Sequence, residues 1–252
     1  MLGIGGGVLL VPFLNIVLGL PLDLASGIGL MTVIATSSVV STNVTGRRLM
    51  NLRLGMVLQI PASFGALAGG IVVARIPKEA LYVMFAIVTA SVALLMLSRL
   101  DRRNVILDPS VDPGKFGGRY YEEESGQEVV YRTSRVPLAL AVSLAAGIVS
   151  GFLGIGGGTL QVPALNAWCG VPMRAAAATS SVMIGVTAVA SAPIYYARGD
   201  VSPPLAAAAV LGVLVGSRLG IWISMRAKAK WLKALMAILL VGVAVMYVIE
   251  AL

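Results

Sequence analysis

The sequence predicts an all-α polytopic membrane protein of two homologous repeats, with helices broken at glycine-rich motifs. Of its 252 residues, 58% are hydrophobic and only 12% are charged, and the mean hydropathy is +0.93. A soluble domain carries about twice that charged fraction. Apolar runs of about 20 residues, enough to cross roughly 30 Å of hydrocarbon as a helix, recur along the chain. A glycine motif also occurs twice.

These apolar runs predict the helices in order, at residues 22–45, 54–74, 79–98, 136–153, 174–197, 203–225 and 231–249. Strand-like alternation is absent from them, which argues against membrane-spanning strands.

The repeats are visible as LGIGGGVLLVPFLN at residues 2–15 and LGIGGGTLQVPALN at residues 153–166, which match at 11 of 14 positions with an offset of 151. GALAGG at 65–70 and GVLVGS at 212–217 continue the match at an offset of 147. A tandem duplication explains this pattern. We expect a first repeat at 1–98, whose counterpart of the helix at 136–153 is missing, and a second at 136–252. Either the first copy lacks that helix or the true start lies upstream.

Between the repeats, residues 99–135 form a charged linker that we expect to be cytoplasmic. It contains seven Lys/Arg and seven Asp/Glu, so the net charge of +8 comes from short loops between helices. Basic loops are typical of cytoplasmic membrane edges, so the charge does not indicate a nucleic-acid partner. If the short segments 8–20 and 159–171 also cross, the basic loops 46–53 and 226–233 share the linker's side, which favours inverted repeats.

The glycine triplets predict deliberate helix breaks, because each glycine costs roughly 1 kcal/mol relative to alanine inside a helix. A helix that begins after such a break offers unpaired N–H groups and a positive dipole end to an anion. The alternative is that the glycines only allow close helix packing. A nucleotide-phosphate loop is excluded, since no Lys-Ser/Thr follows.

Neutral polar residues complete the predicted anion site. Asn15 and Asn166 repeat at the same offset, and Gln161 replaces Leu10 of the first copy. Hydroxyl clusters differ between the copies, and membrane Ser/Thr often bond their own helix backbone instead. The predicted substrate-binding residues are Gly5, Gly6, Gly7, Asn15, Thr36, Ser37, Gly156, Gly157, Gly158, Gln161, Asn166, Thr179, Ser180 and Ser181.

Several chemistries are disfavoured. The chain has no histidine and a single cysteine, so we expect no metal, no cofactor and no internal disulfide. Asp23, Glu79, Asp200 and Glu250 all lie at segment ends, which leaves no carboxylate in a helix centre to carry a proton. An intramembrane enzyme would also lack its acid pair or activated nucleophile.

Taken together, GFLGIGGGTLQVPAL, GVPMRAAAATSS, ARGDV and GVLVGSRLG, in this order, resemble the TauE/SafE family of sulfite and organosulfonate exporters. The first copy repeats the order with GIGGGVLLVPFL, GLPLDLASG, NLRLGM and GALAGG. The resemblance implies an inner-membrane permease for sulfur-containing anions such as sulfite, thiosulfate, sulfoacetate or sulfonates. It leaves the cargo, the direction, the coupling ion and a homo-oligomeric state open. The rival interpretation is a non-transporting membrane scaffold or assembly subunit.

Overall fold

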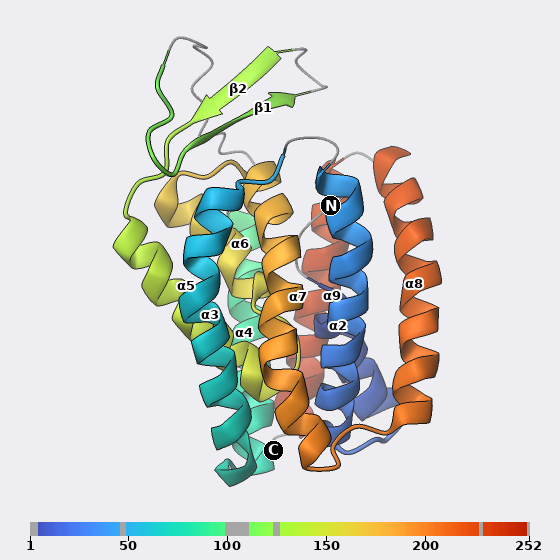
Figure 1. Cartoon of the computed structure of the whole chain (residues 1–252). Helices are drawn as coiled ribbons and strands as arrows, with labels where there is room; N and C mark the ends of the chain where they lie inside the picture. The colour runs from blue at the N-terminus through green and yellow to red at the C-terminus, as the bar shows by residue number, and fades with distance from the viewer. Residues whose placement is uncertain (1–4, 46–48, 99–110, 123–126, 227–228, 251–252) are drawn as a thin grey trace.

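The computed structural model describes residues 5–45, 49–98, 111–122, 127–226 and 229–250. The chain forms a helical bundle with one small hairpin at its end (Figure 1). Its elements, in order, are α1 (Gly7–Pro12), the π-helix Phe13–Val17, α2 (Leu22–Thr45), α3 (Leu52–Val72), the 3-10 turn Val73–Arg75, α4 (Lys78–Ser98), β1 (Gly118–Glu122), β2 (Gln127–Tyr131), α5 (Val136–Leu153), α6 (Gly158–Cys169), α7 (Met173–Ala197), α8 (Pro203–Arg226) and α9 (Ala229–Glu250).

Each apolar run in the sequence corresponds to one long helix, so the predicted all-α membrane architecture is confirmed. Among the described residues, five helices are long and apolar enough to span a membrane: α2, α3, α5, α7 and α8. The predicted helix bounds differ from the observed ones by two residues at most, because the apolar runs end where charged or turn residues begin.

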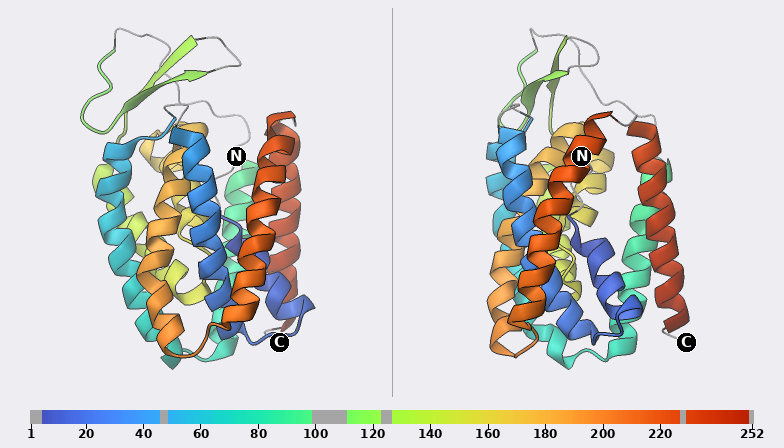
Figure 2. Two further views of the ribbon diagram at one scale, coloured as in Figure 1. Left: turned by 45° about the vertical axis from the view of Figure 1, so that its right-hand side comes forward. Right: turned by 90° about the vertical axis from the view of Figure 1, so that its right-hand side faces the viewer.

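The long helices at corresponding positions of the two predicted repeats run in opposite directions. Helix α2 rises toward the end of the bundle that carries the hairpin, here called the hairpin end, while α7 descends from it (Figure 1). Likewise α3 descends and α8 rises, and α4 rises while α9 descends (Figures 1 and 2). These directions are those that inverted repeats require.

Small residues allow α3 and α5 to pack with their backbones almost in contact. A methyl group added to Gly65 or Gly69 of α3 would lie closer than 3.0 Å to the backbone of α5. A methyl group on Gly147 or Gly151 of α5 would meet the backbone of α3 in the same way. This is the close approach that small residues give membrane helices.

The corresponding glycines of the second repeat make no such contact. Gly212 and Gly216 of α8 align with Gly65 and Gly69 at the offset of 147, yet a methyl group on either would have no neighbour within 4 Å among the described residues. Helix α8 stands at one side of the bundle, and most of its surface is exposed (Figure 2). The two repeats therefore share a sequence pattern but not the same packing.

The linker contains an ordered hairpin that the sequence did not predict. Strands β1 and β2 pair antiparallel, with Gly118 opposite Tyr131 and Glu122 opposite Gln127. Asn51, at the start of α3, attaches this hairpin to the bundle. Its amide donates to the carbonyls of Phe116 and Gly117 at 2.8 and 3.2 Å and to the Tyr131 hydroxyl at 3.1 Å. The basic loops 46–53 and 226–233 lie partly outside the described residues.

Candidate functional site

The second glycine motif interrupts the helical chain inside the bundle, as predicted, whereas the break predicted at residues 3–7 lies partly outside the described residues, which begin at Gly5. Gly5 and Gly156, equivalent positions of the two copies, have φ angles of +74° and +76°, and Gly154 has +68°. L-residues avoid this left-handed region, so the motifs need glycine there. Helix α5 ends at Leu153, and α6 begins at Gly158. The expectation that the helices do not continue through 154–158 is thus confirmed.

The two breaks pack against each other and against equivalent side chains. A methyl group on Gly5 would lie 3.0 Å from Cδ1 of Ile184, and one on Gly156 would lie 3.1 Å from Cγ1 of Val33. Val33 and Ile184 are themselves separated by 151 residues and lie halfway along α2 and α7. A methyl group on Gly7 would lie 3.0 Å from the Gly154 carbonyl oxygen. This reciprocal arrangement is what a twofold relation between the copies would produce.

Helix α6 therefore begins well inside the bundle. The first turn of a helix has N–H groups without intrahelical partners, and the aligned peptide dipoles place positive potential there. Gly158 and Thr159 of this turn are buried, with Thr159 only 2% exposed. A buried, electropositive backbone end is suited to an anion.

Gln161, the fourth residue of α6, is a second buried polar side chain of this turn beside Thr159. It is 1% exposed, and its Oε1 accepts a weak hydrogen bond from the Ser180 hydroxyl at 3.3 Å. Its Nε2 has no hydrogen-bond partner among the described residues. Side chains in a helix lean toward the N-terminus, which directs this side chain toward the first turn of α6. A buried donor without a partner is costly, which marks a place where a polar ligand would be stabilised.

Asn15 and Asn166 have a different environment. The Asn15 amide donates to the Leu20 carbonyl at 2.8 Å, and the Asn166 amide donates to the Val171 carbonyl at 2.9 Å. Each bond closes the turn that follows a short helix, around Gly19 or Gly170 with positive φ. Both asparagines thus stabilise the same local turn in the two copies, and their role in substrate binding stays a prediction.

The hydroxyl groups are mostly bonded to helix backbone. Thr36 donates to Thr32 O and Ser181 donates to Ala177 O, each within its own helix. Ser37 joins the repeats, since its hydroxyl donates to the Ser181 carbonyl across α2 and α7 at 2.7 Å. Ser180, also one of the predicted hydroxyl residues, donates to Oε1 of Gln161.

Thr179 lies on the side of the predicted site that faces the hairpin end of the bundle. Its Oγ1 accepts the Asn51 backbone N–H at 3.0 Å, while the Asn51 side chain caps α3 by accepting from Leu54 N at 3.0 Å. Asn51 was not predicted from the sequence, although an asparagine directly before an apolar run is a recognisable helix N-cap. Asn51 thus joins the hairpin to α7 at Thr179, the first residue of the predicted hydroxyl cluster Thr179–Ser181.

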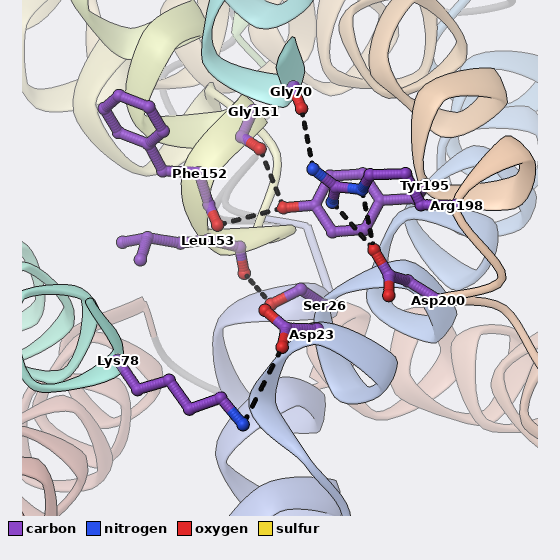
Figure 3. A network of polar contacts seen from close by, with 10 residues as sticks. All are labelled: Asp23, Ser26, Gly70, Lys78, Gly151, Phe152, Leu153, Tyr195, Arg198 and Asp200. Carbon is purple, nitrogen blue, oxygen red and sulfur yellow. Dashed lines mark hydrogen bonds and ion pairs between the residues drawn. The ribbon is translucent and has the colours of Figure 1, made fainter. Parts of the chain in front are cut away.

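The opposite end of the bundle contains a second polar network (Figure 3). The Arg198 guanidinium pairs with the Asp200 carboxylate at 2.8 Å, donates to the Gly70 carbonyl at 3.1 Å and lies 4.6 Å from the centre of the Tyr195 ring. The Tyr195 hydroxyl donates to the carbonyls of Gly151 and Phe152 at 2.9 and 3.0 Å.

Ser26 adds the third bond to the end of α5, donating to the Leu153 carbonyl at 3.1 Å (Figure 3). The last carbonyls of a helix lack intrahelical partners. The hydroxyls of Tyr195 and Ser26 donate to these carbonyls instead and hold the chain where the second break begins. Neither residue was predicted from the sequence, since nothing in the local pattern shows which side chain reaches this carbonyl end.

Charged side chains are absent from the buried part of the described structure. The buried polar side chains there are all neutral: Ser26, Thr32, Ser37, Asn51, Thr89, Ser143, Ser150, Thr159, Gln161, Asn166, Thr179, Ser180, Ser181, Thr187 and Ser191. Within the described ranges, no group of His, Cys, Asp and Glu side chains is arranged to hold a metal ion.

Comparison with known proteins gives one family. The family model for "Sulfite exporter TauE/SafE" matches residues 1–247. The chain is 25% identical over 248 residues to the probable membrane transporter protein YunE of Bacillus subtilis (strain 168), covering 96% of this chain and 89% of that protein. It is 27% identical over 238 residues to a probable membrane transporter protein of Xylella fastidiosa (strain 9a5c), covering 91% and 80%. No solved structure matches it significantly.

Proposed function

Because this chain belongs to the sulfite exporter TauE/SafE family, we propose that it is a permease of the cytoplasmic membrane that moves small sulfur-containing anions. Candidate cargoes are sulfite, thiosulfate, sulfoacetate and sulfonates. The observation that carries the proposal is the buried Gln161 amide, which belongs to the first turn of α6 and lacks a partner among the described residues. An anion bound there would accept hydrogen bonds from this amide and from the free N–H groups of the turn.

The two glycine breaks give this site its position. They meet halfway along α2 and α7, where inverted-repeat transporters place their substrates. Gly5, Gly6 and Gly7 would present the N–H groups of the first copy, and Gly156, Gly157 and Gly158 those of the second. The opposite directions of α2 and α7 support the inverted relation.

The side chains between the breaks also explain how such a site is closed. Val33 and Ile184 cover the glycines of both motifs, and both are buried. We infer that the structure is an occluded form, in which α2 and α7 must shift for the anion to enter. Relative movement of the two repeats is the usual route to alternating access.

Coupling to a proton through a buried carboxylate has no support in the described residues, since none of them places an acid in the interior. Passive movement, or coupling through protonation of the cargo itself, fits the interior better. The basic loops beside the hairpin end favour a cytoplasmic position for that end.

The direct test is flux of labelled sulfite and methanesulfonate into liposomes that contain the purified protein. Gly157→Leu should abolish flux, because a side chain at this position meets the Ala146 backbone at 3.3 Å and crowds the first turn of α6. Gly212→Leu is the matched control, since its side chain enters open space and flux should persist. Normal flux in Gly157→Leu would contradict the proposed site. No flux in the intact, folded protein would favour a membrane scaffold.

A further inference from the structure

We propose that the site at α6 selects anions by charge and carries the singly charged form, rejecting dianions. This inference rests on the proposed function and adds the class of substrate. It narrows the candidate cargoes named above to hydrogensulfite and monosulfonates, and it predicts that the sulfite dianion, thiosulfate, sulfoacetate and disulfonates are carried poorly.

The charge of the hydrogen-bond donors at the site sets how much negative charge an anion can carry there. At the buried site these are the N–H groups of the first α6 turn, the Gln161 amide and the Ser180 hydroxyl, all of them neutral. The helix end contributes roughly half an elementary charge of positive potential. Such a set can compensate one negative charge but has no full positive charge for a second.

None of the lysine and arginine side chains that the structure describes is buried at this site. Arg198 lies at the end opposite the hairpin, and its guanidinium is paired with Asp200 at 2.8 Å. Lys78 lies at the same end, with its side chain 58% exposed and 4.0 Å from Asp23. Arg218 is exposed on α8. Within the part of the chain that the structure describes, no lysine or arginine is buried beside the glycine breaks.

Electrostatics then separates the two classes of anion. The cost of removing an ion from water grows with the square of its charge, whereas attraction to fixed dipoles grows in proportion to the charge. A dianion therefore loses about four times the hydration and gains about twice the attraction at this site. Without a buried cation, the difference disfavours the dianion.

Sulfite offers a direct test, because a change of pH alters its charge and hardly alters its size. Flux of sulfite at constant total concentration is measured in liposomes on both sides of the pH at which hydrogensulfite loses its proton. Methanesulfonate, which keeps a single charge throughout, is the control in the same vesicles. We expect sulfite flux to fall by about tenfold for each pH unit above that point, in step with the hydrogensulfite fraction. Methanesulfonate flux should stay constant.

The outcomes distinguish the inference from the proposed function. Sulfite flux that is constant with pH, or ethanedisulfonate that competes as well as methanesulfonate, overturns the charge selection and leaves the permease intact. If neither sulfite nor methanesulfonate crosses, the proposed function fails and the inference falls with it.

A variant tests the same idea independently. Gln161→Lys places a cation at the first turn of α6. The potency of ethanedisulfonate as a competitor of transport, relative to that of methanesulfonate, should therefore rise by at least about tenfold. Gln59→Lys is the matched control, since this amide belongs to α3 and contacts Ser63 and Thr187 instead. An unchanged preference in a folded Gln161→Lys protein, or the same gain in Gln59→Lys, would contradict the assignment of Gln161.

Discussion

The two repeats carry glycines at equivalent positions that differ in packing, which allows a matched test of helix contact inside the membrane. Gly65 of α3 lies against the backbone of α5, where a methyl group would stand 2.9 Å from Ile148 N and 3.2 Å from the Gly147 carbonyl carbon. A methyl group on Gly212, its counterpart on α8, would have no neighbour within 4 Å in the part of the chain that the structure describes. Alanine at Gly65 must push α3 and α5 apart, and alanine at Gly212 need not.

The magnitude follows from two terms. Alanine gains about 1 kcal/mol over glycine in helix propensity, and this gain is common to both variants. Overpacking costs about 1–3 kcal/mol and applies to Gly65→Ala alone. We therefore expect Gly65→Ala to be less stable than Gly212→Ala by about 1–3 kcal/mol.

The assay is unfolding of the two purified variants in mixed micelles with increasing denaturing detergent, followed by circular dichroism. Both are compared with the wild-type protein. Equal stability of the two variants, or a greater loss in Gly212→Ala, would refute the argument that α5 covers the glycine face of α3 while the equivalent face of α8 is open.

Three further predictions concern the ends of the bundle. Tyr195→Phe leaves the carbonyls of Gly151 and Phe152 without their donor, so unfolding in detergent should show a loss of about 1–3 kcal/mol, and an unchanged free energy would refute the bonds. Asn51→Ala removes both the cap of α3 and the attachment of the hairpin, so trypsin should cut the hairpin faster while the helices stay protected; unaltered cleavage would contradict this. Burial raises the pKa of the Tyr131 hydroxyl above 10.0, although the Asn51 bond lowers it in part. A raised folded-state pKa stabilises the protein below the unfolded value and loses that contribution as pH rises through the folded value. Hairpin attachment, measured by the same cleavage, should therefore weaken only above about pH 10, and Tyr131→Phe should remove that dependence.

Much of the site could be predicted because its main features are local. The glycine breaks follow from the conformational cost of three glycines in a row, and Gly5 and Gly156 have the positive φ that this cost implies. Gln161 was predicted because an amide in an apolar segment needs a partner. Its lack of one became visible only in the folded chain.

Other parts of the site depended on contacts that sequence patterns do not show. Asn15 and Asn166 look like substrate donors in sequence, yet each bonds the carbonyl five residues on. Ser37 resembles Thr36 in sequence, but Thr36 bonds its own helix, whereas Ser37 bonds Ser181 of the other repeat. Rotation about the helix axis separates these two neighbours by roughly 100° and so gives them different partners.

The sequence by itself determined the membrane class, the number and bounds of the long helices, and the places where the chain breaks. These properties depend on the length of apolar runs and on the backbone freedom of glycine, which act within a few residues. Only the tertiary structure decided that the two breaks meet at Val33 and Ile184, that α5 covers α3 while α8 stays uncovered, and that Tyr195 and Ser26 hold the end of α5. Such contacts join residues far apart in the chain, and their free energy depends on how whole helices are placed against one another.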